Sequence, residues 1–149
     1  MNDIQELVFG LRDKNDKYAY QCLKQLESES LNSDTVYPYF DLFSAMLDDP
    51  NSYIRTRGIL LIAANAKWDS DYKIDEIIDN LLTHIMDVKP ITARQCIKSL
   101  PAIAKHKPDL AGDICNALRT VSPVIYKSSM QSLVSKDIHD ALKAITNFK

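Results

Sequence analysis

The stretch LDDPNSYIRTRGILLIAANA, residues 47–66, decides the fold because it ends one helix, turns, and begins another that has no polar face. Asp49 and Pro50 are typical of a helix cap followed by a first-turn proline, so we expect the second helix to start there. From Gly58 to Ala66 this helix is apolar on nearly every side. Because a soluble protein buries such a helix, the stretch predicts neighbouring helices on most of its faces.

Composition and length favour one soluble globular domain over residues 1–149, with 46% hydrophobic and 26% charged residues. The opening MNDIQELVFGLRDKND lacks the basic start and apolar core of a secretory signal. The longest uncharged apolar run, GILLIAANA, is far shorter than the roughly 18 residues that a membrane span requires. We therefore expect a cytoplasmic protein without a membrane partner.

The odd number of cysteines in apolar segments, Cys22, Cys96 and Cys115, predicts buried thiols in a reducing compartment.

Charge is distributed unevenly along the chain. Residues 1–88 carry 16 Asp or Glu against 8 Lys or Arg, whereas residues 89–149 carry 4 against 10. An acidic first half and a basic second half can orient an encounter with a charged partner.

The spacing of apolar residues is helical throughout, and the three glycines are never paired, so the sequence predicts an all-α fold. Asp34 is the expected cap of a third helix with Pro38 in its first turn, and the last two helices are expected to be separate. The helices are predicted over 3–12, 16–29, 35–49, 50–66, 70–87, 89–107, 109–121, 122–135 and 137–146.

The helices recur as pairs, and the second helix of each pair shares a pattern. When Tyr18, Ile54, Thr92 and Ile125 are set as equivalent, the intervals are 36, 38 and 33 residues, the length of one helical hairpin with its turns. In each helix the residue four positions after this equivalent position is small, and the residue eight positions after it is large and aliphatic. The small positions are Cys22, Gly58, Cys96 and Ser129, and the large ones are Leu26, Ile62, Leu100 and Leu133. Small residues allow close approach of the two helices of a pair, and the large ones fill the space between pairs.

The segment LDDPNSYIRTRGILLIA resembles the pattern of the HEAT-repeat (armadillo-like) α-solenoid family. In that pattern a leucine ends the first helix, an Asp-Pro turn follows, and a β-branched residue with an arginine opens the second helix; here these are Leu47, Asp49, Pro50, Ile54 and Arg55. The resemblance implies a right-handed α-α superhelix of about four HEAT-like helical hairpins that serves as a non-catalytic protein-binding or scaffold module. It also implies that Arg55 pairs with an aspartate, and Asp48, Asp49 and Asp87 are the candidates.

A basic stripe is the predicted binding surface. Arg94, Lys98 and Lys105 fall within about 40° of one another on a helical wheel, provided that Pro101 bends the helix without ending it. Lys127 stands at the corresponding position one repeat later. Arg57, in the helix predicted over 50–66, is a further candidate. Such a stripe on the inner face of a curved stack suits a protein or an acidic peptide; the alternative is an ordinary solvated face. A nucleic acid is the less favoured partner because the pI is about 5.9.

No motif for catalysis, a metal or a cofactor is visible. His84, His106 and His139 do not form a known metal-ligand spacing with the cysteines, and neither a glycine-rich phosphate loop nor a nucleophile elbow occurs. We therefore expect a protein that is not an enzyme and has no cofactor. One alternative remains: a DNA-binding relative, or a degenerate remnant, of the HEAT-like DNA alkylation-repair glycosylases, with Trp68 and Asp69 near Arg57 as its site. The other reading of Trp68 is a packing residue at a turn.

Overall fold

The computed structural model describes residues 3–148, which form eight α-helices and five short 3-10 helices and contain no strand. The all-α prediction is therefore confirmed. The α-helices are α1 (Ile4–Gly10), α2 (Asp16–Asn32), α3 (Phe40–Met46), α4 (Ser52–Ala64), α5 (Lys73–Thr83), α6 (Pro90–His106), α7 (Ala111–Arg119) and α8 (Ser128–Thr146). The 3-10 helices are η1 (Tyr37–Tyr39), η2 (Ala66–Trp68), η3 (His84–Met86), η4 (Pro108–Leu110) and η5 (Pro123–Ile125).

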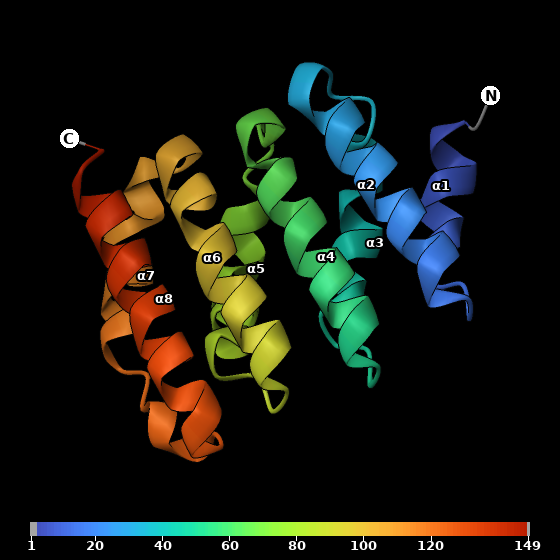
Figure 1. The fold of residues 1–149 in the computed structure, drawn as a ribbon. Coiled ribbons are helices and arrows are strands. Elements are labelled where there is room, and N and C mark those ends of the chain that lie inside the picture. Colours follow the sequence, from blue (N-terminus) through green and yellow to red (C-terminus); the bar gives the residue numbers. More distant parts are fainter. Residues whose placement is uncertain (1–2, 149) are drawn as a thin grey trace.

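The helices lie in two layers, with the two ends of the chain at opposite ends of the row (Figure 1). In one layer α2, α4, α6 and α8 contact one another in succession. Behind them α1 packs on α2, α3 on α4, α5 with its extension η3 on α6, and α7 on α8. We call α2, α4, α6 and α8 the second helices, because each is the second member of its helical hairpin. Among the described residues none of the helices is long and apolar enough to cross a bilayer.

The apolar helix α4 is covered as its sequence predicts. Ile59, Leu61 and Ile62 are fully buried, since α3, α2 and α6 all pack against the helix that carries them. Burial of each such side chain contributes about 1.5–3 kcal/mol before conformational entropy is subtracted.

The predicted start of α4 is wrong by two residues. Its cap is Asn51, whose side chain accepts a hydrogen bond from the Tyr53 N–H, and the helix begins at Ser52. Asp49 accepts from the Asn51 N–H instead, so it shapes the turn before the helix, in which Pro50 also lies. Two residues that can form a cap, Asp49 and Asn51, stand on either side of Pro50, and Asn51 is the cap because its side chain reaches a free N–H of the first turn.

Two further helix predictions need correction. Pro38 lies in η1 rather than in an α-helix, and α3 begins only at Phe40. The two helices predicted over 122–135 and 137–146 are one, α8, because neither proline nor glycine interrupts residues 128–146. Pro101, in contrast, lies inside α6 without ending it, as the predicted basic stripe requires.

The small positions of three hairpins lie where the second helix meets the first. A Cβ added to Gly10 would lie 2.5 Å from the Cys22 sulfur, one added to Gly58 would lie 2.8 Å from Met46 Cβ, and Cys96 Sγ–H donates to the Leu81 carbonyl at 3.6 Å. The fourth hairpin departs from the prediction: Ser129 is exposed and Leu133 is 38% exposed. The buried apolar residues of α8 are Val134, Ala141 and Ile145, so the predicted register of this hairpin is wrong.

Candidate functional site

A groove of about 840 Å³ runs across the starts of three second helices, α2, α4 and α6. We call it the second-helix groove. Its lining includes Tyr20 and Leu23 from α2, Tyr53 and Leu60 from α4, and Ile91 from α6. Tyr20, Tyr53 and Ile91 are 55%, 61% and 59% exposed, so the groove presents apolar surface that the chain itself does not cover.

The same groove is basic. Lys17, Lys24 and Lys89 line it, and neither Lys17 nor Lys89 pairs with an acidic side chain in the described residues. Lys24 stands 5.3 Å from the Tyr20 ring centroid, and the Arg57 guanidinium carbon stands 6.0 Å from the Tyr53 ring centroid. These cation–π pairs place positive charge beside aromatic faces, which suits a segment that carries both carboxylates and apolar side chains.

Arg57 reaches the groove, although most of the side chain is buried. Its Nη1 donates to the Leu11 carbonyl at 2.9 Å, and its Nη2 donates to Asp16 Oδ1 at 3.3 Å. Arg57 therefore ties the first hairpin to the second and at the same time lines the groove beneath Tyr53.

The four remaining residues of the predicted binding set lie outside this groove. Lys98 and Lys105 are exposed on α6, and Lys127 is exposed at the N-cap of α8. Arg94 is engaged within the chain, since its Nε donates to Asp137 Oδ2 at 2.6 Å. This hydrogen bond raises the pKa of Arg94 above its usual value. Lys98 shares a small cavity with Asp137 and Asp140, so the stripe is less basic than its sequence implies.

The residues that the sequence prediction missed are Tyr20, Tyr53 and Ile91 with Lys17, Lys24 and Lys89. A signal for two of them exists in the sequence, because Tyr20 stands four residues before Lys24 and Tyr53 four residues before Arg57. At this spacing two side chains share one helix face, so each pair predicts an aromatic ring beside a cation.

The pairing of Arg55 with a neighbouring aspartate is confirmed, and the partner is Asp87. Arg55 Nε and Nη2 donate to the two oxygens of that carboxylate at 3.0 and 2.8 Å. Arg55 Nη1 also donates to the Asp49 and Pro50 carbonyls. Desolvation opposes ionisation of Asp87, but hydrogen bonds from Arg55, His84 and the Lys89 N–H outweigh it and lower the pKa of this carboxyl. These four hydrogen bonds occupy four of the five N–H groups of the Arg55 guanidinium, so this side chain serves mainly to join hairpins.

The predicted grouping of Trp68, Asp69 and Arg57 does not occur. Trp68 Nε1 donates to the Ser30 carbonyl near the end of α2, whereas Arg57 contacts Asp16 at its beginning. These contacts lie 14 residues apart on one helix, about 20 Å at 1.5 Å per residue. Trp68 thus packs at a turn.

Asp69 belongs to a second buried network. Its carboxylate accepts hydrogen bonds from the Tyr37 hydroxyl at 2.6 Å and from the N–H groups of Lys73 and Ile74 at 2.9 Å. Lys107 Nζ lies 3.1 Å from it. Desolvation raises the pKa of Asp69, but these donors outweigh it and the net shift is downward. Because every donor is supplied by the chain, Asp69 has the surroundings of a structural carboxylate.

The three cysteines are buried free thiols, and burial raises the pKa of Cys96. Among residues 3–148 no group of three His, Cys, Asp or Glu side chains could hold a metal ion. Comparisons with protein-family models, with curated proteins and with solved structures found no match to this chain. The function must therefore be inferred from the geometry of the chain itself.

Proposed function

We propose that this chain is a protein-binding or scaffold module without catalytic activity, built as a right-handed α-α superhelix of four HEAT-like hairpins. Its working surface is the inner face made by the second helices, and its partner is a protein segment that carries acidic residues. The observation that carries this proposal is the second-helix groove, with its exposed Tyr20, Tyr53 and Ile91 and its uncompensated Lys17 and Lys89.

The hairpin order supports the superhelix. Four second helices contact one another in succession, and the Arg55–Asp87 pair links two consecutive hairpins, as the resemblance to HEAT repeats implies. In stacked repeats of this kind, successive second helices present their side chains on one continuous surface. The groove draws its lining from three such helices, so a single bound segment would contact three hairpins.

Arg94, Lys98, Lys105 and Lys127 retain a place in the proposal as a second basic region on the later second helices. Exposed lysines there attract an acidic segment over a distance of about 8–10 Å at physiological salt. This contribution is expected in the association rate more than in the final affinity.

The alternative of a glycosylase relative has weaker support. Trp68 and Asp69 are hydrogen-bonded to groups of the chain itself, and Arg57 contacts the other end of α2.

A selection of short random peptides displayed on phage tests the proposal. We expect enriched sequences in which Asp or Glu flanks an aromatic or aliphatic residue. The double substitution Tyr20→Ala with Tyr53→Ala should weaken binding of the best synthetic peptide by about tenfold or more, since exposed aromatic anchors dominate such interfaces. The control is Phe9→Ala on α1, which removes a similarly exposed aromatic ring that does not line the groove. Failure to enrich any peptide, or equal binding by the groove variant and the control, would refute the proposal.

Charge reversal of Arg94, Lys98 and Lys105 to Glu sharpens the same experiment. We expect slower association of the acidic peptide and a weaker dependence of its affinity on salt, with dissociation nearly unchanged. Duplex DNA serves as the competing ligand. Strong, steeply salt-dependent binding of DNA together with release of a damaged base would favour the glycosylase relative instead.

A further inference from the structure

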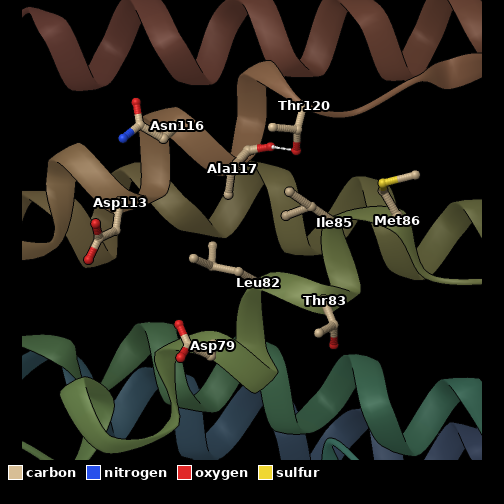
Figure 2. A pocket seen from close by; sticks show the side chains of 9 residues that line it. All are labelled: Asp79, Leu82, Thr83, Ile85, Met86, Asp113, Asn116, Ala117 and Thr120. Atoms are coloured by element: carbon tan, nitrogen blue, oxygen red, sulfur yellow. Dashed lines mark hydrogen bonds between the residues drawn. The ribbon is translucent and has the colours of Figure 1, made fainter.

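A second groove, of about 470 Å³, lies in the other helix layer, between α5 with η3 and α7 (Figure 2). We call it the first-helix groove. It draws Asp79, Leu82 and Thr83 from α5, Ile85 and Met86 from η3, and Asp113, Asn116, Ala117 and Thr120 from α7 and its end. None of these residues lines the second-helix groove.

The charge of this groove is opposite to that of the other. Asp79 and Asp113 extend toward one end of it from the two facing helices (Figure 2). Both side chains are exposed, and neither forms a hydrogen bond or an ion pair with any described residue. Eight other aspartates pair with a cation, whereas Asp34, Asp71 and Asp109 do not pair with one in the described residues; the paired ones are Asp16, Asp41, Asp49, Asp69, Asp75, Asp87, Asp137 and Asp140. Two unpaired carboxylates on opposite walls attract the same positive charge.

Apart from Asn116 and two threonines, the rest of the groove is apolar. Leu82, Ile85 and Ala117 form its middle, and Met86, 38% exposed, lies toward the end away from the two carboxylates (Figure 2). The Thr83 and Thr120 hydroxyls donate to carbonyls of their own helices, so they do not make this surface strongly polar.

Apolar exposure continues beyond Met86 along the adjoining turns. Val88 is 80% exposed in the turn before α6, and Val124 is 72% exposed in η5. The Tyr126 hydroxyl donates to the Asp87 carbonyl at 2.6 Å, which holds these two turns together. An apolar surface of this kind beside a charged end marks an interaction site more often than a solvated face.

We infer that the first-helix groove binds a basic segment of a partner protein, with a Lys or Arg side chain between Asp79 and Asp113 and an aliphatic side chain over Leu82, Ile85 and Ala117. The module then has two docking surfaces of opposite charge, one on each helix layer. A chain of this form can hold an acidic segment and a basic segment at the same time. It therefore bridges two partners, or two parts of one partner.

The test is a second selection from the same displayed library of short random peptides, followed by counter-selection against the variant Asp79→Asn with Asp113→Asn. We expect the surviving sequences to contain Lys or Arg beside Leu, Ile or Met. A synthetic peptide of the most enriched sequence should bind the wild type about tenfold more tightly than the double variant. Because neither carboxylate has a partner among residues 3–148, the variant should unfold within a few degrees of the wild type.

Two controls separate this surface from general acidity and from the second-helix groove. Glu76→Gln with Asp109→Asn removes the same charge from exposed positions outside the groove and should change affinity less than about twofold. Tyr20→Ala with Tyr53→Ala should leave binding of the basic peptide unchanged, so this inference and the proposed function can fail separately. The inference is overturned if no basic peptide is enriched, if both acidic double variants weaken binding alike, or if a polylysine peptide without aliphatic residues binds equally well.

Discussion

Two arginines on neighbouring second helices, Arg55 in α4 and Arg94 in α6, each bind an aspartate of the following hairpin, yet they do so in different surroundings. The side chains of Arg55 and Asp87 are 11% and 3% exposed, and those of Arg94 and Asp137 are 22% and 6% exposed. Arg55 contacts both carboxylate oxygens within 3.0 Å, whereas the second contact of Arg94 is 3.4 Å long.

The difference extends to the neighbours of each pair. Asp87 also accepts hydrogen bonds from His84 and the Lys89 N–H, and Arg55 donates to two carbonyls. Asp137 and Arg94 have no further partners among the described residues. The first pair is one part of a buried network that fixes two hairpins. The second is a single pair at the edge of the basic stripe, and we expect a partner's carboxylate to compete with Asp137 there.

Loss of the Asp87 carboxylate should have the largest effect on stability. Asp87→Ala leaves the buried Arg55 guanidinium without its counter-charge, and breaking a buried pair in this way costs about 3–5 kcal/mol. Urea unfolding followed by circular dichroism measures the loss. If the free energy of unfolding falls by less than about 1 kcal/mol, the Arg55–Asp87 pair contributes no more to stability than a surface ion pair.

A substitution at Gly58 tests how much the packing of α3 on α4 contributes to stability, independently of the Arg55–Asp87 pair. Gly58→Leu places a side chain where even a Cβ would lie 2.8 Å from Met46 Cβ and from the Phe43 carbonyl, so we expect a loss of about 1–3 kcal/mol. The matched control is Gly112→Ala in α7, where an added Cβ meets nothing within 4 Å. That change should stabilise the protein by about 0.5–1 kcal/mol through helix propensity. Equal effects at the two glycines would contradict the assigned close contact.

Acid should weaken the Arg55–Asp87 pair, because it protonates the Asp87 carboxylate. The folded-state pKa of Asp87 lies below the unfolded value of about 3.9, so its stabilisation is complete above that pH and is lost as the pH falls through the folded-state value. One such group makes the free energy of unfolding fall by up to about 1.4 kcal/mol per pH unit in that window. Urea unfolding between about pH 2 and 5 should show a shallower slope for Asp87→Asn than for wild type. Identical slopes would mean that Asp87 is not ionised against Arg55.

Removal of Asp137 should have the smallest effect. Arg94 is partly exposed and can turn to solvent when it loses its partner, so Asp137→Ala should cost about 1 kcal/mol or less. The same variant frees the Arg94 guanidinium, and we expect it to bind acidic peptides slightly more tightly. If thermal unfolding shifts as far as in Asp87→Ala, the two joints are equivalent after all.

The two arginines also show how far the sequence could predict the structure. Arg55 stands in the segment that resembles the HEAT-repeat pattern, and its pairing with an aspartate was predicted from that resemblance. Arg94 pairs with Asp137, 43 residues further along, and that region was predicted as two helices in a different register. An error in the fourth hairpin therefore hid the carboxylate that partly neutralises the basic stripe.

The same distinction applies to the grooves. Helix type and the small residues at Cys22, Gly58 and Cys96 depend on spacing along one or two helices, and these predictions agree with the structure. The grooves depend on which faces of three separate helices converge, and spacing within one helix does not contain that information. Only the i,i+4 pairs of tyrosine with a cation offered a local signal for the second-helix groove.

A pair of double-mutant cycles, for Arg55 with Asp87 and for Arg94 with Asp137, tests most directly the claim that one joint holds the stack while the other stays open to a partner. Each cycle compares the free energies of unfolding of the two single alanine variants, the double variant and the wild type, which isolates the coupling between the two side chains. We predict a coupling of about 2–3 kcal/mol for Arg55 with Asp87 and below about 1 kcal/mol for Arg94 with Asp137. Equal couplings, or a stronger one at Arg94, would contradict this account.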